Sequence, residues 1–199
     1  MNLIGNRIPY EYFITSGKGE SDVGSSGLPY ETGSFDAALT DAGINNVNIM
    51  KYSSMVPPVS KEISKHKGTK NINWGEVMEC IMAESSGSKG SKISAAVVIT
   101  DVIDPKGTRL GGVACEYSGN QSKKELEKSL CASIKEIIER RNFGKTGDIE
   151  MGKTYITDKG YKIHPGKIFK YETMIVKKNH GTVIASICFV NYIYPTIKK

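Results

Sequence analysis

The sequence predicts an α+β protein, a layered sandwich built on mostly antiparallel sheets. Short runs rich in Val and Ile recur along the chain, and two amphipathic helical segments stand far apart between them. Strands and helices do not alternate regularly, which argues against a parallel sheet with crossover helices. The 199 residues contain no shift in composition and no linker, so we expect a single domain over residues 1–199.

The first predicted elements are a strand, a loop and a short helix. Residues 8–16 are aromatic and β-branched, as in a strand, whereas residues 17–33 are rich in Gly and Ser, which predicts a long loop. A helix is expected from Ser34, which is suited to cap it, to Gly43, which is suited to end it. Its apolar face consists of Phe35, Ala38, Leu39 and Ala42.

The strands of the middle and end of the chain follow from apolar runs between turns. Residues 47–55 alternate partly, and Pro57-Pro58 should end this strand because proline cannot continue a ladder and restrains the residue before it. Further strands are expected over 76–83, 94–103 and 110–117, and a hairpin of 169–177 and 182–192 across residues 179–181.

The helical signal is strongest from Ser122 onward. Ser122 and Glu125 form a capping box, in which each side chain satisfies the other residue's backbone N–H. The helix should end at Arg140-Arg141. One face carries Leu126, Leu130, Ile134, Ile137 and Ile138.

Composition and charge argue against membrane and nucleic-acid partners. No apolar run approaches the roughly 18 residues that cross a bilayer, and Arg7 and Glu11 stand where a signal peptide is apolar, so we expect a cytoplasmic protein. The net charge of +6 raises the question of nucleic acid. The lysines of 61–70 are mixed with Glu and Gly, however, which favours a solvated loop over a binding stripe.

The cysteines and histidines predict neither disulfides nor a metal site. The three histidines are isolated from one another and from every cysteine, whereas zinc ligands come in closely spaced pairs. Each cysteine lies among apolar neighbours, which predicts buried free thiols. The four are Cys80, Cys115, Cys131 and Cys188.

Three Ser-Ser pairs occur, at 25–26, 53–54 and 85–86. The first and third lie in Gly-rich segments, where a flexible turn with hydroxyls bonded to nearby backbone is a sufficient explanation. Ser53-Ser54 instead ends an apolar strand and precedes the double proline, which can hold the preceding peptide in a fixed geometry. Context therefore singles out the second pair.

Several blocks occur in a fixed order around this pair: FDAAL at 35–39, AGINNVN at 42–48, SSMVPP at 53–58, GGVACEY at 111–117 and SKKE at 122–125. Together they resemble the pyruvoyl-dependent arginine decarboxylase family, and GEVMECIMA at 75–83 is similar to its bacterial members. The resemblance implies α/β/β/α layers and a precursor that cleaves itself into a β chain, 1–53, and an α chain, 54–199.

The resemblance also implies the chemistry. Ser54 Oγ attacks the Ser53 carbonyl, β-elimination of the resulting ester leaves dehydroalanine, and hydrolysis with loss of ammonia leaves a covalently bound pyruvoyl group at position 54. This ketone condenses with the substrate's α-amine and accepts the electrons left when carbon dioxide departs. The implied reaction converts L-arginine to agmatine and carbon dioxide without an added cofactor or metal.

The resemblance assigns roles to five further positions. Glu116 returns a proton to the α-carbon, for which a partly buried carboxylate with a raised pKa is suited, and Asn48 is an amide near the scissile bond that stabilises a developing oxyanion. Asp36, Leu39 and Ser53 bind substrate, the carboxylate of Asp36 suiting a guanidinium. Each polar residue also has an ordinary structural explanation. Glu116 could be a solvent-facing strand residue, Asn48 a turn or strand-edge residue, and Asp36 an aspartate in the first helical turn that interacts favourably with the helix dipole.

The family resemblance further implies a homo-oligomer, a trimer or a dimer of trimers, with active sites between subunits. Two alternatives remain open. The same chemistry could act on histidine or another amino acid, because pyruvoyl-dependent histidine decarboxylases resemble this family and residues 147–180 lack a match. A non-catalytic oligomeric binding protein is supported only by the net charge.

Overall fold

Two five-stranded sheets pack face to face in the computed structural model, which describes residues 2–23, 30–70 and 72–198. The first sheet has the order β3 (Asn48–Lys51), β6 (Val77–Ser88), β11 (His180–Ile193), β2 (Ile8–Ser21) and β5 (Lys61–Glu62). The second has the order β4 (Met55–Val56), β8 (Arg109–Gly119), β7 (Lys92–Ile103), β10 (Lys162–Ile175) and β9 (Tyr155–Ile156). All neighbours are antiparallel except the pairs β3–β6 and β2–β5.

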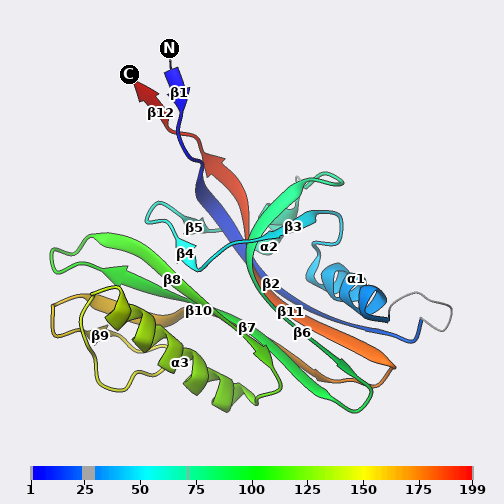
Figure 1. The fold of residues 1–199 in the computed structure, drawn as a ribbon. Helices are drawn as coiled ribbons and strands as arrows, with labels where there is room; N and C mark the ends of the chain where they lie inside the picture. Colours follow the sequence, from blue (N-terminus) through cyan, green and yellow to red (C-terminus); the bar gives the residue numbers. More distant parts are fainter. Residues whose placement is uncertain (1, 24–29, 71, 199) are drawn as a thin grey trace.

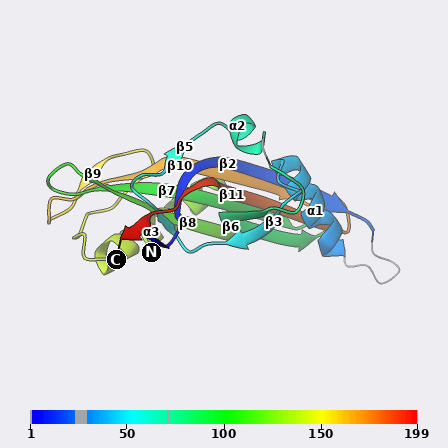
Figure 2. The same ribbon diagram turned by 90° about the horizontal axis from the view of Figure 1, so that it is seen from above.

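Helices cover the outer faces of the two sheets (Figures 1 and 2). α1 (Tyr30–Ala42) lies on the first sheet and α3 (Lys123–Arg140) on the second, while α2 (Lys65–Thr69) is a short turn near β2. A two-stranded ribbon of β1 (Asn2–Ile4) and β12 (Thr196–Lys198) projects from the sandwich. The predicted α+β class with mostly antiparallel sheets is confirmed.

The core consists of three apolar layers. Each sheet is covered on both faces, and side chains alternate between the faces of a strand, so each strand contributes to two layers. The layer between the sheets includes Ile81, Val97 and Phe189, each at most 1% exposed. A second layer lies under α1 and a third under α3. Among the described residues no helix is long and apolar enough to cross a membrane.

Strand β2 is longer than expected, because it runs through Gly17 and Gly19 to Ser21. The predicted loop over 17–33 is therefore wrong in its first part, and residues 24–29 lie outside the described residues. The glycines allow close packing instead of a turn. A Cβ on Gly17 would lie 2.1 Å from the carbonyl oxygen of Ala38, and one on Gly19 would lie 2.4 Å from that of Ser34, so α1 can approach the sheet only over glycine.

Helix α1 begins at Tyr30, earlier than the predicted cap at Ser34. Ser34 is fully buried, and its hydroxyl contacts the Glu31 carbonyl and the side chains of His180 and Thr182. The expected end is confirmed, since Gly43 adopts φ 71° directly after the helix. The short polar side chain of Ser34 thus bonds the helix to β11 and does not start the helix.

The predicted strand over 47–55 is divided between the two sheets. β3 ends at Lys51 and pairs with β6, whereas β4 begins at Met55 and pairs with β8. The chain therefore leaves one sheet and enters the other across residues 52–54, which we call the crossing turn. Partial alternation does not show such a change of sheet, because both pieces have the same period of two.

The predicted hairpin over 169–192 is wrong, because β10 and β11 belong to different sheets. β10 pairs with β7, and β11 lies between β6 and β2. Both strands carry apolar residues toward the layer between the sheets, so they stack across it. Two hydrogen bonds join the β6–β7 connection to the β10–β11 connection. The Val176 N–H donates to the Ser91 carbonyl at 2.9 Å, and the Gly90 N–H donates to the Val176 carbonyl at 2.8 Å.

The predictions for α3 and the cysteines are confirmed. The carboxylate of Glu125 accepts a hydrogen bond of 2.8 Å from the Ser122 backbone N–H, and the helix ends at Arg140. Of its predicted apolar face only Ile137 is partly exposed. All four cysteines are buried and free.

Candidate active site

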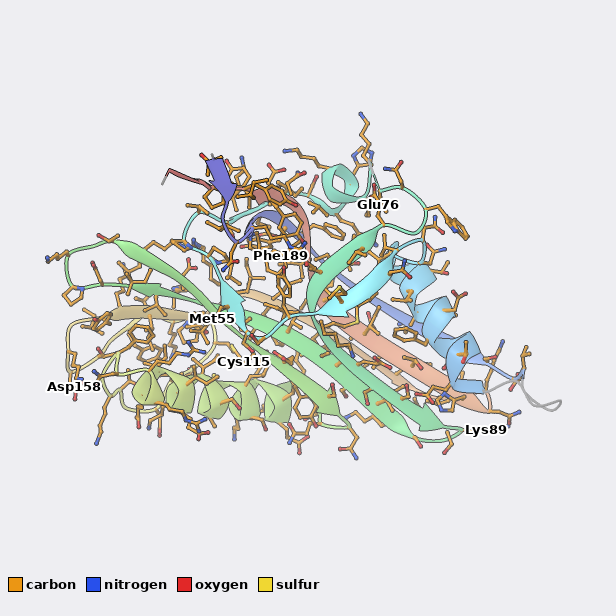
Figure 3. All side chains as sticks on the ribbon, turned by 45° about the horizontal axis from the view of Figure 1, so that its top comes forward. Met55, Glu76, Lys89, Cys115, Asp158 and Phe189 are labelled. Atoms are coloured by element: carbon orange, nitrogen blue, oxygen red, sulfur yellow. The ribbon has the colours of Figure 1, made fainter. Side chains whose placement is uncertain are left out.

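The crossing turn joins the edges of the two sheets and contains the Ser53-Ser54 bond. At its start the Tyr52 backbone N–H donates to the Cys80 carbonyl of β6, at 2.7 Å. At its end the Ser54 carbonyl accepts a hydrogen bond of 2.9 Å from the Ala114 N–H of β8. Met55 and Cys115, both labelled in Figure 3, lie at this edge of the second sheet. The bond is thus held from both sides by different sheets.

A tight backbone turn is centred on Ser54. The Met55 N–H donates to the Ser53 carbonyl oxygen at 2.9 Å, an i to i+2 hydrogen bond typical of γ-turns. This carbonyl is the one that the Ser54 hydroxyl would attack. A backbone donor on its oxygen is suited to stabilise negative charge that develops there.

Tyr52 anchors the residue before the serine pair. Its ring packs against the layer between the sheets, with its centroid 5.7 Å from that of Phe189. The guanidinium of Arg7 lies beside the Tyr52 hydroxyl and forms an ion pair with the buried carboxylate of Glu79. These contacts fix the start of the crossing turn on the first sheet.

Glu116 lies two residues beyond Ala114 on β8 and therefore on the same face of the strand. It is exposed in the single chain, but enough protein surrounds its carboxylate that burial raises the pKa of Glu116. Interaction with the Ser54 hydroxyl and the charge of Lys51 lower this pKa in part, and the net direction is upward. A carboxyl group that retains its proton beyond the usual range thus lies beside Ser54.

Lys51 is a neighbour of this site that sequence reasoning missed. It is the last residue of β3, and its Nζ lies 3.0 Å from Oε2 of Glu84 on β6. The backbone N–H of Glu84 in turn donates to the Ser118 hydroxyl of β8, at 3.1 Å. Its place directly before Tyr52 is the only signal in the sequence that could have indicated it. The Lys51 ammonium thus pairs with Glu84 and, through its charge, acts on the carboxylate of Glu116.

Asp36 and Leu39 are not brought to the serine pair by the fold of one chain. Both lie on α1, where Asp36 is exposed and Leu39 is 8% exposed in the apolar layer beneath the helix. Figures 1 and 3 show α1 on the outer face of the first sheet, apart from β4 and the crossing turn. These two residues share a helix but no site with Ser54 within the single chain.

Asn48 also lies away from the scissile bond within one chain. It begins β3, and its side-chain amide donates to the Gly75 carbonyl at 2.8 Å. β3 rises about 3.3 Å per residue, which separates Asn48 from Lys51 by about 10 Å before the crossing turn begins. The Met55 N–H, and not the Asn48 amide, bonds to the Ser53 carbonyl in this structure.

Of the other two Ser-Ser pairs, the one that the structure describes, Ser85-Ser86, lies on a strand away from the crossing turn. Ser25-Ser26 lies outside the described residues. Ser85 and Ser86 belong to strand β6, and not to a loop as expected; their hydroxyls contact the Gly119 carbonyl and Thr182. No group of three or more His, Cys, Asp or Glu side chains within the described part of the chain is arranged to hold a metal ion.

Comparison with known proteins identifies the family of the chain. The family model for pyruvoyl-dependent arginine decarboxylase matches residues 11–194. Pyruvoyl-dependent arginine decarboxylase 2 of Archaeoglobus fulgidus is 34% identical over 113 residues, which cover 56% of this chain and 66% of that protein. A pyruvoyl-dependent arginine decarboxylase of Chlamydia muridarum is 28% identical over 205 aligned residues, covering 94% of each chain. The chain belongs to the pyruvoyl-dependent arginine decarboxylase family, whose members are lyases.

Proposed function

We propose that this chain cleaves itself between Ser53 and Ser54 and then decarboxylates L-arginine to agmatine. The observation that carries the proposal is the crossing turn, which holds the Ser53 carbonyl against the Met55 N–H, at 2.9 Å, and Ser54 beside Glu116. The names of the related proteins support arginine as the substrate. The products of cleavage are chains 1–53 and 54–199.

The cleavage step uses groups within the crossing turn. Ser54 Oγ adds to the Ser53 carbonyl carbon, and the Met55 N–H stabilises the charge on the carbonyl oxygen. The C–N bond then breaks, and the ester that forms loses its carboxylate by β-elimination, so that Ser53 becomes a free C-terminus. Water replaces ammonia at the remaining dehydroalanine, and residue 54 ends as a pyruvoyl group.

The surroundings of Ser54 fit such a group. The Ser54 carbonyl is bound by the Ala114 N–H, so a ketone formed at the adjacent Cα would stay beside Glu116. Once formed, the pyruvoyl group supplies an electron sink for the pair released when carbon dioxide leaves. Glu116, whose pKa is raised, donates the proton that the α-carbon then requires.

We further propose that the active site is completed by a second copy of the chain, in a trimer or a dimer of trimers. Asp36, Leu39 and Asn48 lie away from Ser54 within one chain, although Asp36 is exposed and suited to a guanidinium. A neighbouring subunit that supplied these residues would place a carboxylate, an apolar contact and an amide near the pyruvoyl group.

A complementation experiment tests the shared site. Chains with Asp36→Asn and chains with Glu116→Gln should each be nearly inactive, but co-expressed chains should regain activity, because some interfaces then combine an intact Asp36 with an intact Glu116. The matched control combines wild-type chains with chains that carry both substitutions, which measures activity from wild-type interfaces alone. No recovery in the mixed oligomer, with both chains present, would contradict the proposal.

The substrate is tested with a panel of carboxyl-labelled amino acids and release of carbon dioxide. We expect arginine to be turned over fastest and Asp36→Asn to reduce turnover of arginine more than that of histidine, since only arginine carries a guanidinium. Equal or faster turnover of histidine would overturn the assignment of arginine while leaving the cleavage chemistry intact.

A further inference from the structure

A network of three charged side chains, from β7, β8 and β10, lies close to the double proline. Asp101 on β7 is 5% exposed, and its Oδ1 accepts hydrogen bonds from Arg109 Nε at 3.1 Å and Nη2 at 2.9 Å. Lys167 Nζ donates to the other oxygen, Oδ2, at 2.5 Å. Burial alone would raise the pKa of Asp101, but the two cations outweigh it and lower the pKa overall.

Arg109 also binds the chain that follows the serine pair. Its remaining terminal nitrogen, Nη1, donates to the Pro58 carbonyl at 2.6 Å and to the Pro57 carbonyl at 3.3 Å. One guanidinium therefore joins a buried carboxylate of the second sheet to the backbone of the double proline. Lys167 binds the same carboxylate. Among the described residues, Asp101 is the only partner to which the Lys167 ammonium donates a hydrogen bond.

Other contacts of the segment from Ser54 to Pro58 come from its own turn and from β8. The Ala114 N–H binds the Ser54 carbonyl, and the Ser60 N–H binds the Pro57 carbonyl at 3.1 Å, so among these contacts Arg109 alone links the double proline to Asp101 of the second sheet. β4 consists of two residues, Met55 and Val56, which pair with Val113 and Gly112 of β8. Proline has no N–H to donate to a neighbouring strand, so the carbonyls of residues 57 and 58 are what the protein can bind there. Once the bond before Ser54 is cut, this segment becomes a free chain end.

We infer that Arg109 is a positioning residue, which holds the Pro57-Pro58 segment so that Ser54 stays in the crossing turn during self-cleavage and its pyruvoyl product stays beside Glu116 afterwards. The inference rests on the proposed function. Arg109 does not touch the reacting atoms; it acts through the backbone between Pro58 and Ser54.

The chemistry of the network favours arginine in this role. The planar guanidinium directs its donors in fixed directions, so one side chain can bind a carboxylate and two carbonyls at once, which the single ammonium of lysine does less well. Charge balance alone does not require this arrangement, because Lys167 already pairs with Asp101. Gly111, with φ 125°, allows the close approach, since a Cβ there would lie 2.5 Å from the Val56 carbonyl oxygen.

The experiment compares two ways of removing a cation from the same carboxylate. Chains with Arg109→Ala and Lys167→Ala are made by cell-free synthesis beside the wild type, and the loss of uncleaved chain is followed over time by intact mass. Thermal unfolding of each purified chain reports whether it is folded. If Arg109→Ala does not fold, Arg109→Gln, which keeps one hydrogen-bonding amide, replaces it.

We expect Arg109→Ala to cleave at least about tenfold more slowly than wild type, because small displacements of reacting groups are costly in rate. Lys167→Ala should remain within about twofold, since an exposed partner contributes little. In the cleaved fraction of Arg109→Ala, kcat should fall while KM changes little, because Arg109 does not contact the substrate.

Two results would overturn the inference. One is a folded Arg109→Ala chain, or its Arg109→Gln substitute, that cleaves at the wild-type rate. The other is equal slowing by Arg109→Ala and Lys167→Ala, which would show that the network matters only for stability. Failure of the wild-type chain itself to cleave would instead contradict the proposed function, so the two failures are distinguishable.

Discussion

At the scale of single residues, Glu116 is exposed in the single chain and its pKa is nevertheless raised above the usual value. A carboxyl group whose pKa is higher in the folded chain than in the unfolded chain stabilises the fold at pH values below the unfolded pKa, and this contribution is lost as the pH rises through the folded pKa. At neutral pH its ionised form is therefore unfavourable to folding, while its protonated form is the one needed as an acid.

Glu116→Gln should consequently separate activity from stability. We expect carbon dioxide release to fall at least about a hundredfold, because the proton donor is lost. The midpoint of thermal unfolding at pH 7 should stay the same or rise. The wild-type rate should decline as the pH rises through a pKa above the usual value of about 4.3. A lower unfolding midpoint with unchanged activity would contradict this account of Glu116.

The cysteines provide a second prediction at this scale. Burial raises the pKa of Cys80 to about 11 and that of Cys115 to about 12, and all four thiols are inaccessible. A thiol-specific reagent at pH 8 should therefore react slowly with the native protein and rapidly, with four equivalents, after unfolding in denaturant. Rapid reaction of any cysteine in the native protein would show that its thiol is more accessible to solvent than the structure indicates.

At the scale of elements, two glycines determine how closely α1 lies on β2. Gly17 and Gly19 are predicted from the sequence to lie in a loop, because glycine is frequent in turns. The same residue type also serves where a backbone passes close to a strand, and composition alone does not distinguish the two uses. The strands, by contrast, were predictable where apolar runs were long, as in β7 and β8.

Gly17→Ala should therefore destabilise the protein although alanine suits a strand at least as well as glycine. The added Cβ would lie 2.1 Å from the Ala38 carbonyl oxygen, so α1 has to move. We expect a loss of about 2 to 3 kcal/mol in the free energy of unfolding, measured by chemical denaturation. Gly147→Ala is the matched control, because a Cβ there meets nothing within 4 Å. Equal stability of the two variants would contradict the packing described for β2.

At the scale of the whole molecule, the two proposed fragments are interleaved. β2 of residues 1–53 pairs with β11, and β3 pairs with β6, so strands of the smaller fragment contribute to the first sheet. β1 also pairs with β12 in the projecting ribbon. Cleavage at the crossing turn removes one covalent bond but none of these pairings.

We therefore expect the cleaved chains to remain together until the fold is lost. Size-exclusion chromatography in native buffer should elute both fragments in one peak, and only denaturant should separate them. A Ser54→Ala chain, which should not cleave, serves as the control for the elution position. Release of the smaller fragment in native buffer would contradict the strand pairings.

How much of the site could be predicted also depends on this scale. Ser54 and Glu116 lie on segments far apart in sequence, and the family resemblance predicts a role for both. The hydrogen bond from the Met55 N–H is not predictable from the sequence, because every residue except proline has a backbone N–H. Arg109 was missed for a related reason, since its acceptors include the carbonyls of two prolines. Asp36 and Asn48 lie away from Ser54 within one chain, and the second subunit proposed to bring them there is not specified geometrically by one sequence.

The central claim is that residue 54 becomes a pyruvoyl group when the chain cleaves itself. Intact-mass measurement and fragmentation of the larger chain test it most directly. We predict two chains, the smaller ending at Ser53 and the larger beginning with a pyruvoyl group at position 54, blocked to stepwise degradation from its N-terminus. An uncleaved 21.7 kDa chain with an ordinary serine at position 54 after long incubation, or a cut at another bond, would contradict the account.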